Sequence, residues 1–366
     1  MAKRIALRGL AFVVLGLGAP LALAHPTFFA KNYRSCLGCH ASPEGGGLLT
    51  SYGQSVAMAE SFFVKSQAEM GEESPELKIF ADRVRLGLHA RVMAVKPEGA
   101  ELSVFPMQAD TFADWAVNDQ HRVHMTLGYN GVRGTVREGL TDYLALRRLY
   151  YAYRTETGFD LELGRDYAPA PLLVDDHTAY TRGETRHGVD DAVTLVRGYW
   201  GREDYDFSAF LIGPGFHEAD ENREYGIGGR VEYQPRRELS FGAYSLSASS
   251  SALSRWHGSL FGRGALAERY GLLWEYSHVR RSFQRDGSFG ENIVAFRPFV
   301  LMGPALVSFP VETLSIQAPF EDRRTKLGPR VDLRAFGHVS LIGIYQREIQ
   351  KAGARNAWSL QLFGYF

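Results

Sequence analysis

Two cysteines and a histidine carry the clearest chemical signal in this sequence. Cys36, Cys39 and His40 form a Cys-x-x-Cys-His motif, and the chain has 2 cysteines in 366 residues, both in this motif. Two thiols at this spacing can form thioether bonds with the vinyl groups of one porphyrin, while the next residue places an imidazole on the iron. The motif therefore predicts one covalently attached haem c, with His40 as the proximal ligand of the haem iron.

Three other uses of a cysteine pair fit this sequence less well. A thioredoxin-like redox pair lies at the start of a helix in a βαβ unit, which the surrounding sequence lacks. A zinc site needs four ligands and usually two such pairs. A disulfide across two intervening residues closes a very small loop and adds little stability to a long chain. Haem attachment is the interpretation that the pattern favours.

The distal ligand of the haem iron is left open by the sequence. Met58, Met70 and His25 are the candidates near the motif. A methionine ligand raises the reduction potential of a haem, and a histidine ligand lowers it. Met58 equally fits as an apolar residue of a predicted helix over residues 54–67, and a vacant sixth position is a further alternative.

The chain begins with the pattern of a secretory signal. Basic residues up to Arg8 precede an apolar stretch over residues 10–23, which ends at Ala22-Leu23-Ala24. This stretch is shorter than the ~20 residues that a membrane-spanning helix needs, and a cleavage site follows it. We expect cleavage after Ala24, which places the mature chain, beginning at His25, outside the cytoplasm.

Three further regions follow the signal peptide of residues 1–24. Residues 25–70 are predicted to form a small α-helical c-type haem segment, too short to bury a core without the haem. Residues 71–80 are polar, contain Pro75 and are predicted to be a linker. Residues 81–366 are predicted to form an all-β region, because apolar and polar residues alternate along them. The formal net charge of the chain is +0, so no nucleic-acid partner is indicated.

The alternating region is predicted to be an antiparallel outer-membrane β-barrel. Its segments are long enough to cross a bilayer, for which a tilted strand needs about 9–11 residues. A soluble sandwich would alternate in the same way. Aromatic residues near strand ends and a final strand that stops on Phe366 favour the barrel. The aromatic residues predicted to form interface girdles are Tyr150, Tyr151, Tyr153, Tyr199, Trp200, Trp274 and Tyr276.

Sixteen strands are predicted, or fourteen if the two weakest segments, residues 102–117 and 306–317, are not strands. Connections alternate between short ones, expected in the periplasm, and long ones such as residues 167–190 and 281–290, expected to face outward. The remaining segments are 81–95, 121–133, 143–154, 158–166, 191–201, 205–214, 223–234, 238–249, 254–264, 267–280, 291–303, 325–336, 339–349 and 356–366.

Charged residues of both signs are predicted to line the barrel lumen. The plain interpretation is a hydrated lumen with compensating charges, and the functional one is that some of them contact the haem propionates. The predicted lumen residues are Arg148, Arg154, Asp160, Glu162, Arg165, Arg230, Glu232, Glu275, Arg330, Asp332 and Arg334.

The whole arrangement resembles the outer-membrane fused monohaem cytochrome c–porins, whose known examples come from iron-oxidising bacteria. The "SPEGGG" stretch after the haem motif departs from the pattern of the iron-oxidase type. The residues that carry the resemblance are Pro26, Phe29, Ala30, Cys36, Cys39, His40, Pro43, Leu49, Tyr52 and Gly53. The resemblance implies a bacterial outer-membrane protein, with its haem segment on the periplasmic side or inside the barrel.

Three functions are compatible with one haem on a barrel. The first is an electron conduit between an extracellular donor or acceptor, such as Fe(II), and a periplasmic cytochrome. The second is a solute-transport porin with the haem segment as plug, sensor or docking module. The third is a barrel that sheathes a separate multihaem cytochrome. Candidate outward Fe(II) ligands are Asp175, Asp176, His177, His217, Glu218, Asp220 and Glu221.

Overall fold

The computed structural model describes most of the region predicted to be all-β. The described residues are 77–80, 83–129, 144–172, 179–187, 191–202, 204–215, 223–236, 238–266, 269–284, 287–317, 321–336 and 339–365. The predicted signal peptide, the haem segment of residues 25–70 and residues 71–76 lie outside these ranges. The seven candidate Fe(II) ligands of the outward connections also lie outside them.

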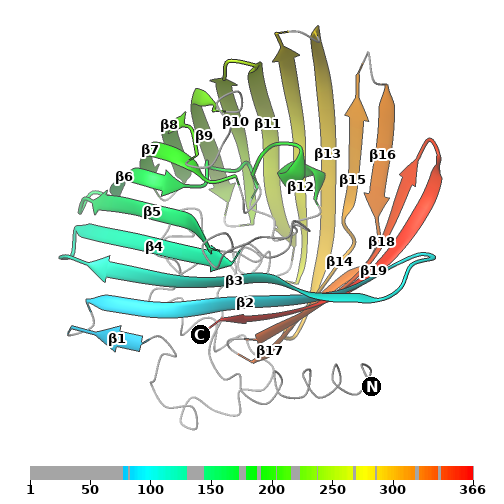
Figure 1. The fold of residues 1–366 in the computed structure, drawn as a ribbon, viewed down its shortest axis with the longest axis horizontal. Helices are drawn as coiled ribbons and strands as arrows, with labels where there is room; N and C mark the ends of the chain where they lie inside the picture. Colours follow the sequence, from blue (N-terminus) through cyan, green and yellow to red (C-terminus); the bar gives the residue numbers. More distant parts are fainter. Residues whose placement is uncertain are drawn as a thin grey trace.

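The described strands form one closed antiparallel sheet (Figure 1). β2 (Val84–Pro97) pairs with β3 (Ser103–Ala116), and each strand up to β13 pairs with the next one in the chain. β19 (Gly353–Tyr365) returns to pair with β2, which leaves no open edge. The strands between are β4 (His121–Tyr129), β5 (Leu144–Arg154), β6 (Phe159–Asp166), β7 (Val193–Gly201), β8 (Tyr205–Gly213), β9 (Tyr225–Arg236), β10 (Leu239–Ser249), β11 (Leu253–Leu266), β12 (Tyr270–Phe283), β13 (Gly287–Met302) and β18 (Val339–Gln350).

Two spanning strands of the barrel are each interrupted by a proline. β14 (Ala305–Ser308) continues as β15 (Val311–Ile316), and β16 (Asp322–Leu327) continues as β17 (Arg330–Phe336). Proline cannot donate a ladder hydrogen bond, and Pro310 and Pro329 fall at the two interruptions. Gly328 has a φ of +154°, and a Cβ there would lie 2.1 Å from the Tyr345 carbonyl oxygen. Counting each interrupted pair once gives sixteen spanning strands, so the prediction of sixteen rather than fourteen is confirmed.

The two faces of the wall differ as the alternation predicts. On β6, Leu161 and Leu163 are 38% and 54% exposed on the outer face, whereas Asp160 and Glu162 are 4% and 3% exposed on the lumen face. An apolar outer face on a closed barrel fits a lipid bilayer. Among the described residues, no helix is long and apolar enough to cross a membrane.

The predicted aromatic girdles are correct in part. Tyr151, Trp200 and Tyr276 are 38%, 45% and 42% exposed on the outer face. Tyr150 and Tyr199 are instead 4% and 6% exposed and face the lumen. Neighbours in a strand point to opposite faces, so of the adjacent pairs Tyr150-Tyr151 and Tyr199-Trp200 only one member can face lipid.

The two ends of the barrel carry different connections. At one end, here called the turn end, β-strands are joined by short turns such as residues 202–204 and 237–238, and β19 finishes there. At the other, the loop end, lie the long connections of residues 130–143, 167–192 and 214–224. The predicted long connection over residues 281–290 is wrong, because β12 runs to Phe283 and β13 begins at Gly287.

The short strand β1 (Leu77–Ile79) lies within the predicted linker of residues 71–80. It pairs antiparallel with β2 at the turn end, with Ile79 opposite Val84 and Leu77 opposite Leu86. β1 thus lies beside the first spanning strand (Figure 1). The barrel wall therefore extends back to Leu77.

Candidate functional site

The described part of the candidate site is the lumen of the barrel. The predicted haem residues Cys36, Cys39 and His40, and the distal candidates Met58, Met70 and His25, lie outside the described residues. Within the described ranges, no group of three or more His, Cys, Asp or Glu residues is placed to hold a metal ion. The described residues with a possible functional role are therefore those of the lumen wall and of the connection between β6 and β7.

A network of buried ion pairs lies on the lumen side of β3 to β7. Arg148 forms a bidentate pair with Asp166, at 2.5 Å and 2.8 Å. Arg197, 0% exposed, pairs with Glu162 and lies 4.0 Å from Asp166. Buried charges need such partners because their desolvation is costly. The predicted inward position of Arg148 and Glu162 is confirmed.

A second group of charges continues around the wall. Glu232 accepts from Arg230 at 2.5 Å, from Ser240 at 2.6 Å and from Arg263 at 2.8 Å. On β17, Arg330 donates to Asp332 at 2.8 Å. The charges compensate one another, as the sequence predicts.

One predicted lumen residue, Arg165, is placed wrongly. It lies on the outer-face side of β6 together with Leu161 and Leu163, and its Nε donates to the Leu146 carbonyl oxygen at 2.8 Å. The alternation itself shows this, because residues 161, 163 and 165 share one face of a strand.

The connection between β6 and β7 folds into the lumen. The backbone N–H of Tyr180, in the single helical turn α5 (Tyr180–Gly183), donates to Glu312 of β15 at 2.8 Å. The Tyr180 hydroxyl donates to Glu348 of β18 at 2.6 Å. The Lys326 ammonium lies 3.9 Å from the centre of the Tyr180 ring. Since β15 is on the opposite wall from β6 in the strand order, the loop crosses the lumen.

Three arginines of the wall hold the same loop through its carbonyl groups. Arg255 of β11 donates to the Thr185 carbonyl at 2.8 Å, and Arg281 of β12 donates to that of Glu184. Arg230 of β9 donates to the carbonyl of Pro171 at 3.3 Å. The described part of the loop is thus fixed on several strands.

The prediction that residues 167–190 face outward is wrong for their described part. The sequence does carry a signal for the inward path. Pro169, Ala170, Pro171 and Leu172 form an apolar run inside a long connection, and outward loops are normally polar. Ala170 and Leu172 are 9% and 8% exposed.

His187 is packed against the wall beneath this loop. Its Nε2 lies 3.0 Å from the Pro169 carbonyl oxygen, and its Nδ1 lies 2.8 Å from the Thr185 hydroxyl. Its ring meets those of Tyr244 and His257 edge-on, at centroid distances of 5.7 Å and 5.6 Å. Burial, with the Arg255 charge beside it, lowers the pKa of His187 to about 3. The imidazole is therefore neutral at neutral pH, and its contribution to the loop is lost only as pH falls from the ordinary histidine pKa towards 3.

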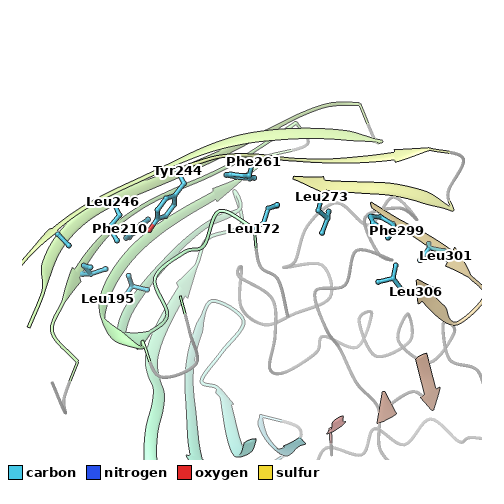
Figure 2. Packing of buried hydrophobic residues seen from close by; sticks show 12 residues of the cluster. Leu172, Leu195, Phe210, Tyr244, Leu246, Phe261, Leu273, Phe299, Leu301 and Leu306 are labelled. Carbon is cyan, nitrogen blue, oxygen red and sulfur yellow. The ribbon is translucent and has the colours of Figure 1, made fainter. Parts of the chain in front are cut away.

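A large apolar surface lies on the lumen side of β7 to β14. Here called the apolar belt, it is shown in Figure 2, where the labelled side chains lie on the concave side of the wall. Gly228 of β9 makes room for it, because a Cβ there would lie 2.4 Å from the Phe210 ring. The belt consists of Leu172, Leu195, Phe210, Ile212, Tyr244, Leu246, Ala248, Phe261, Leu273, Phe299, Leu301 and Leu306.

The apolar belt was not predicted by the sequence pattern. Alternation led us to expect a hydrated lumen, whereas Phe261 and Leu246 of the belt are 0% and 1% exposed. Apolar side chains on the inner wall of a barrel are stable when something other than water covers them. The lumen therefore combines paired charges with an apolar wall.

Comparison with known proteins identifies the architecture. No protein-family model matches the sequence, and no curated protein sequence matches it. OmpT of Vibrio cholerae, expressed in the outer membrane, has a similar structure, with a TM-score of 0.62 and 10% identity over 79% of this chain and 100% of that chain. The fold is that of an outer-membrane β-barrel.

Two further solved structures share this barrel at low sequence identity. An anion-selective porin from Comamonas acidovorans gives a TM-score of 0.58 and 11% identity, over 77% of this chain and 99% of that chain. The outer membrane channel DcaP of Acinetobacter baumannii gives a TM-score of 0.57 and 10% identity, over 79% of this chain and 99% of that chain. The likeness is one of fold, and it covers the barrel.

Proposed function

We propose that this protein is an outer-membrane electron conduit, in which one haem c attached at Cys36 and Cys39 and ligated by His40 passes electrons across the membrane. The Cys-x-x-Cys-His motif and the predicted signal peptide support the haem and the export. The porin-like fold supports the outer membrane. The partner on the periplasmic side is a cytochrome or another electron carrier, and Fe(II) is the candidate donor outside.

The observation that carries this proposal is the burial of the lumen wall. Phe261 of β11 and Ile342 of β18 are each 0% exposed, although both face the lumen. Ile293 of β13 is also 0% exposed, and it packs against Tyr180 of the loop that crosses the lumen. A sixteen-strand barrel is wide enough to hold an aqueous channel, and the wall of such a channel would be wet. A buried wall favours a filled barrel over an open pore.

The described lumen fits a flat, largely apolar group with acidic edges. The apolar belt offers apolar contact, and the lumen arginines offer partners for carboxylates. A bound haem would supply one-electron chemistry. The residues of the wall would exclude water from it and compensate its charge.

The geometry also sets the distance over which electrons must move. The apolar zone of an outer-membrane barrel is about 25 Å tall. A haem held inside the lumen shortens the path to the partner on either side, whereas one held in the periplasm leaves the full width of the membrane. A lumen filled by the haem segment is therefore the arrangement that electron transfer across the membrane requires.

The second candidate is a solute-transport porin. It is favoured by the similar structures, which include an anion-selective porin and an outer membrane channel. On this alternative the inward loop, described over residues 167–172 and 179–187, narrows an open channel, and the haem segment acts as a plug, sensor or docking module.

Ion conductance in planar bilayers distinguishes the two functions. We expect the purified full-length protein to conduct poorly, and a variant lacking residues 25–70 to conduct better, because the inward loop alone then narrows its lumen. A full-length protein that conducts as well as the deletion variant would contradict the conduit and support the porin. The deletion variant must retain its barrel, which circular dichroism of the strands verifies.

A further inference from the structure

Five rings form a continuous row on the lumen wall near the turn end. His89 of β2 lies between Phe363 of β19 and Phe112 of β3, at centroid distances of 5.9 Å and 5.1 Å. Phe112 stacks on His124 of β4 at 6.4 Å, and His124 stacks on Tyr150 of β5 at 5.0 Å. This row, here called the ring band, thus occupies five adjacent strands.

The ring band is buried although it faces a wide lumen. Phe112, His124, Tyr150 and Phe363 are 3%, 2%, 4% and 3% exposed. In the described residues, the inward loop is held mainly by β9 to β12, β15 and β18. At its start, the Tyr167 ring lies 5.8 Å from the Arg148 guanidinium, so among these contacts that of Tyr167 is the one that reaches a strand of the ring band, β5. Another occupant of the lumen is therefore expected to cover the rings.

The short strand β1 lies beside this band. β1 runs antiparallel to β2, and Leu77 pairs with Leu86, whereas Ile79 pairs with Val84 at the turn end. Leu77 therefore lies three residues along β2 from His89 of the ring band. A short tether of residues 71–76 gives the haem segment a high effective concentration at this part of the wall.

The charge of this sector suits the haem segment. The six arginines of this sector outnumber by two the carboxylates of Asp110, Asp114, Asp160 and Asp166, with which most of them pair, so its net charge is positive. Residues 25–70 hold three basic and three acidic side chains, to which a haem adds two propionates. The charged residues that face the lumen from the described parts of β2 to β5 are Arg85, Arg91, Arg122, Arg147, Arg148, Arg154, Asp110 and Asp114.

We propose that residues 25–70, carrying the haem, pack against the ring band in the half of the lumen nearest the turn end. The inference rests on the proposed function, and it identifies the part of the lumen wall against which the haem segment packs. Stacking of flat rings and apolar burial hold the segment there. The neighbouring arginines face its propionates.

Photocrosslinking from the wall tests this placement directly. The variants are Phe112→p-benzoylphenylalanine in the ring band, Phe261→p-benzoylphenylalanine in the apolar belt, and Trp115→p-benzoylphenylalanine, which lies on β3 but faces lipid. Each carries a specific protease site between Glu73 and Ser74. After irradiation and cleavage, a denaturing gel is stained for haem, which stays covalently bound to its fragment.

We expect haem stain at the combined mass of the haem fragment and the barrel fragment from position 112, and only at the mass of the free haem fragment from position 115. A link from position 261 without one from position 112, or no link from either, overturns the placement. In both cases, haem stain on the free fragment would still support the proposed function. Absence of haem from the uncleaved protein would instead contradict the proposed function.

Discussion

Replacing both Cys36 and Cys39 with alanine is expected to abolish the c-type haem absorbance of the outer-membrane fraction. Both thioether bonds need these thiols, and the chain has no other cysteine to replace them. The loss is expected to be complete, because the porphyrin would have no covalent attachment. Difference spectra of oxidised and reduced membranes measure it.

The barrel is expected to assemble normally in this double variant. Its described strands run from Val84 to Tyr365 and contain neither cysteine. Ser35→Ala, next to the motif, is the matched control and should keep the full absorbance. A haem spectrum that survives in the double variant, or is missing from the natural protein, would contradict the assignment of the motif.

Replacing Arg197 with methionine is expected to cause the largest loss of barrel stability. Arg197 is 0% exposed and lies between the side chains of Glu162 and Asp166, which are 3% and 1% exposed. Its replacement by methionine removes the positive charge next to these two buried carboxylates. Breaking a buried ion pair by removing one partner typically costs about 3–5 kcal/mol in the free energy of unfolding. Guanidinium unfolding of the detergent-solubilised protein, followed by tryptophan fluorescence, measures this change.

Arg154→Met is the matched control for this experiment. The Arg154 side chain is 38% exposed and pairs with Asp160 at the turn end. Asp160 is 4% exposed, but the Arg154 end of the pair is solvated, so the unfolding midpoint should move less than with Arg197→Met. Adding Glu162→Gln to Arg197→Met should recover part of the lost stability, because Glu162 is the carboxylate that loses its arginine partner, whereas Asp166 keeps Arg148. Equal midpoints for Arg197→Met and Arg154→Met would show that the network does not stabilise the barrel.

Most of the barrel could be predicted from sequence because its physics is local. Alternation with period two follows from the geometry of each strand, so sixteen segments and the inward position of residues such as Glu232 and Asp332 could be derived without knowing their neighbours. The interrupted strand of β14 and β15 was a weak prediction because Phe309 and Pro310 break its alternation.

The parts that escaped prediction depend on contacts between distant residues. The path of residues 179–187 is set by partners such as Glu312 and Arg255, which no local pattern connects to Tyr180 and Thr185. Leu246 also lies on the lumen face, where alternation predicts a polar residue. Its neighbours in space come from other strands, so the apolar belt emerges only when the barrel is closed.

Electron transfer across a sealed bilayer tests the central claim most directly. Liposomes containing the purified protein are loaded with an oxidised c-type cytochrome, and a Fe(II) chelate coupled to dextran, too large for a pore, is added outside. The proposed function predicts reduction of the enclosed cytochrome with the natural protein and none with the Cys36→Ala/Cys39→Ala variant. Equal rates for the two proteins, or no reduction by either, would contradict it.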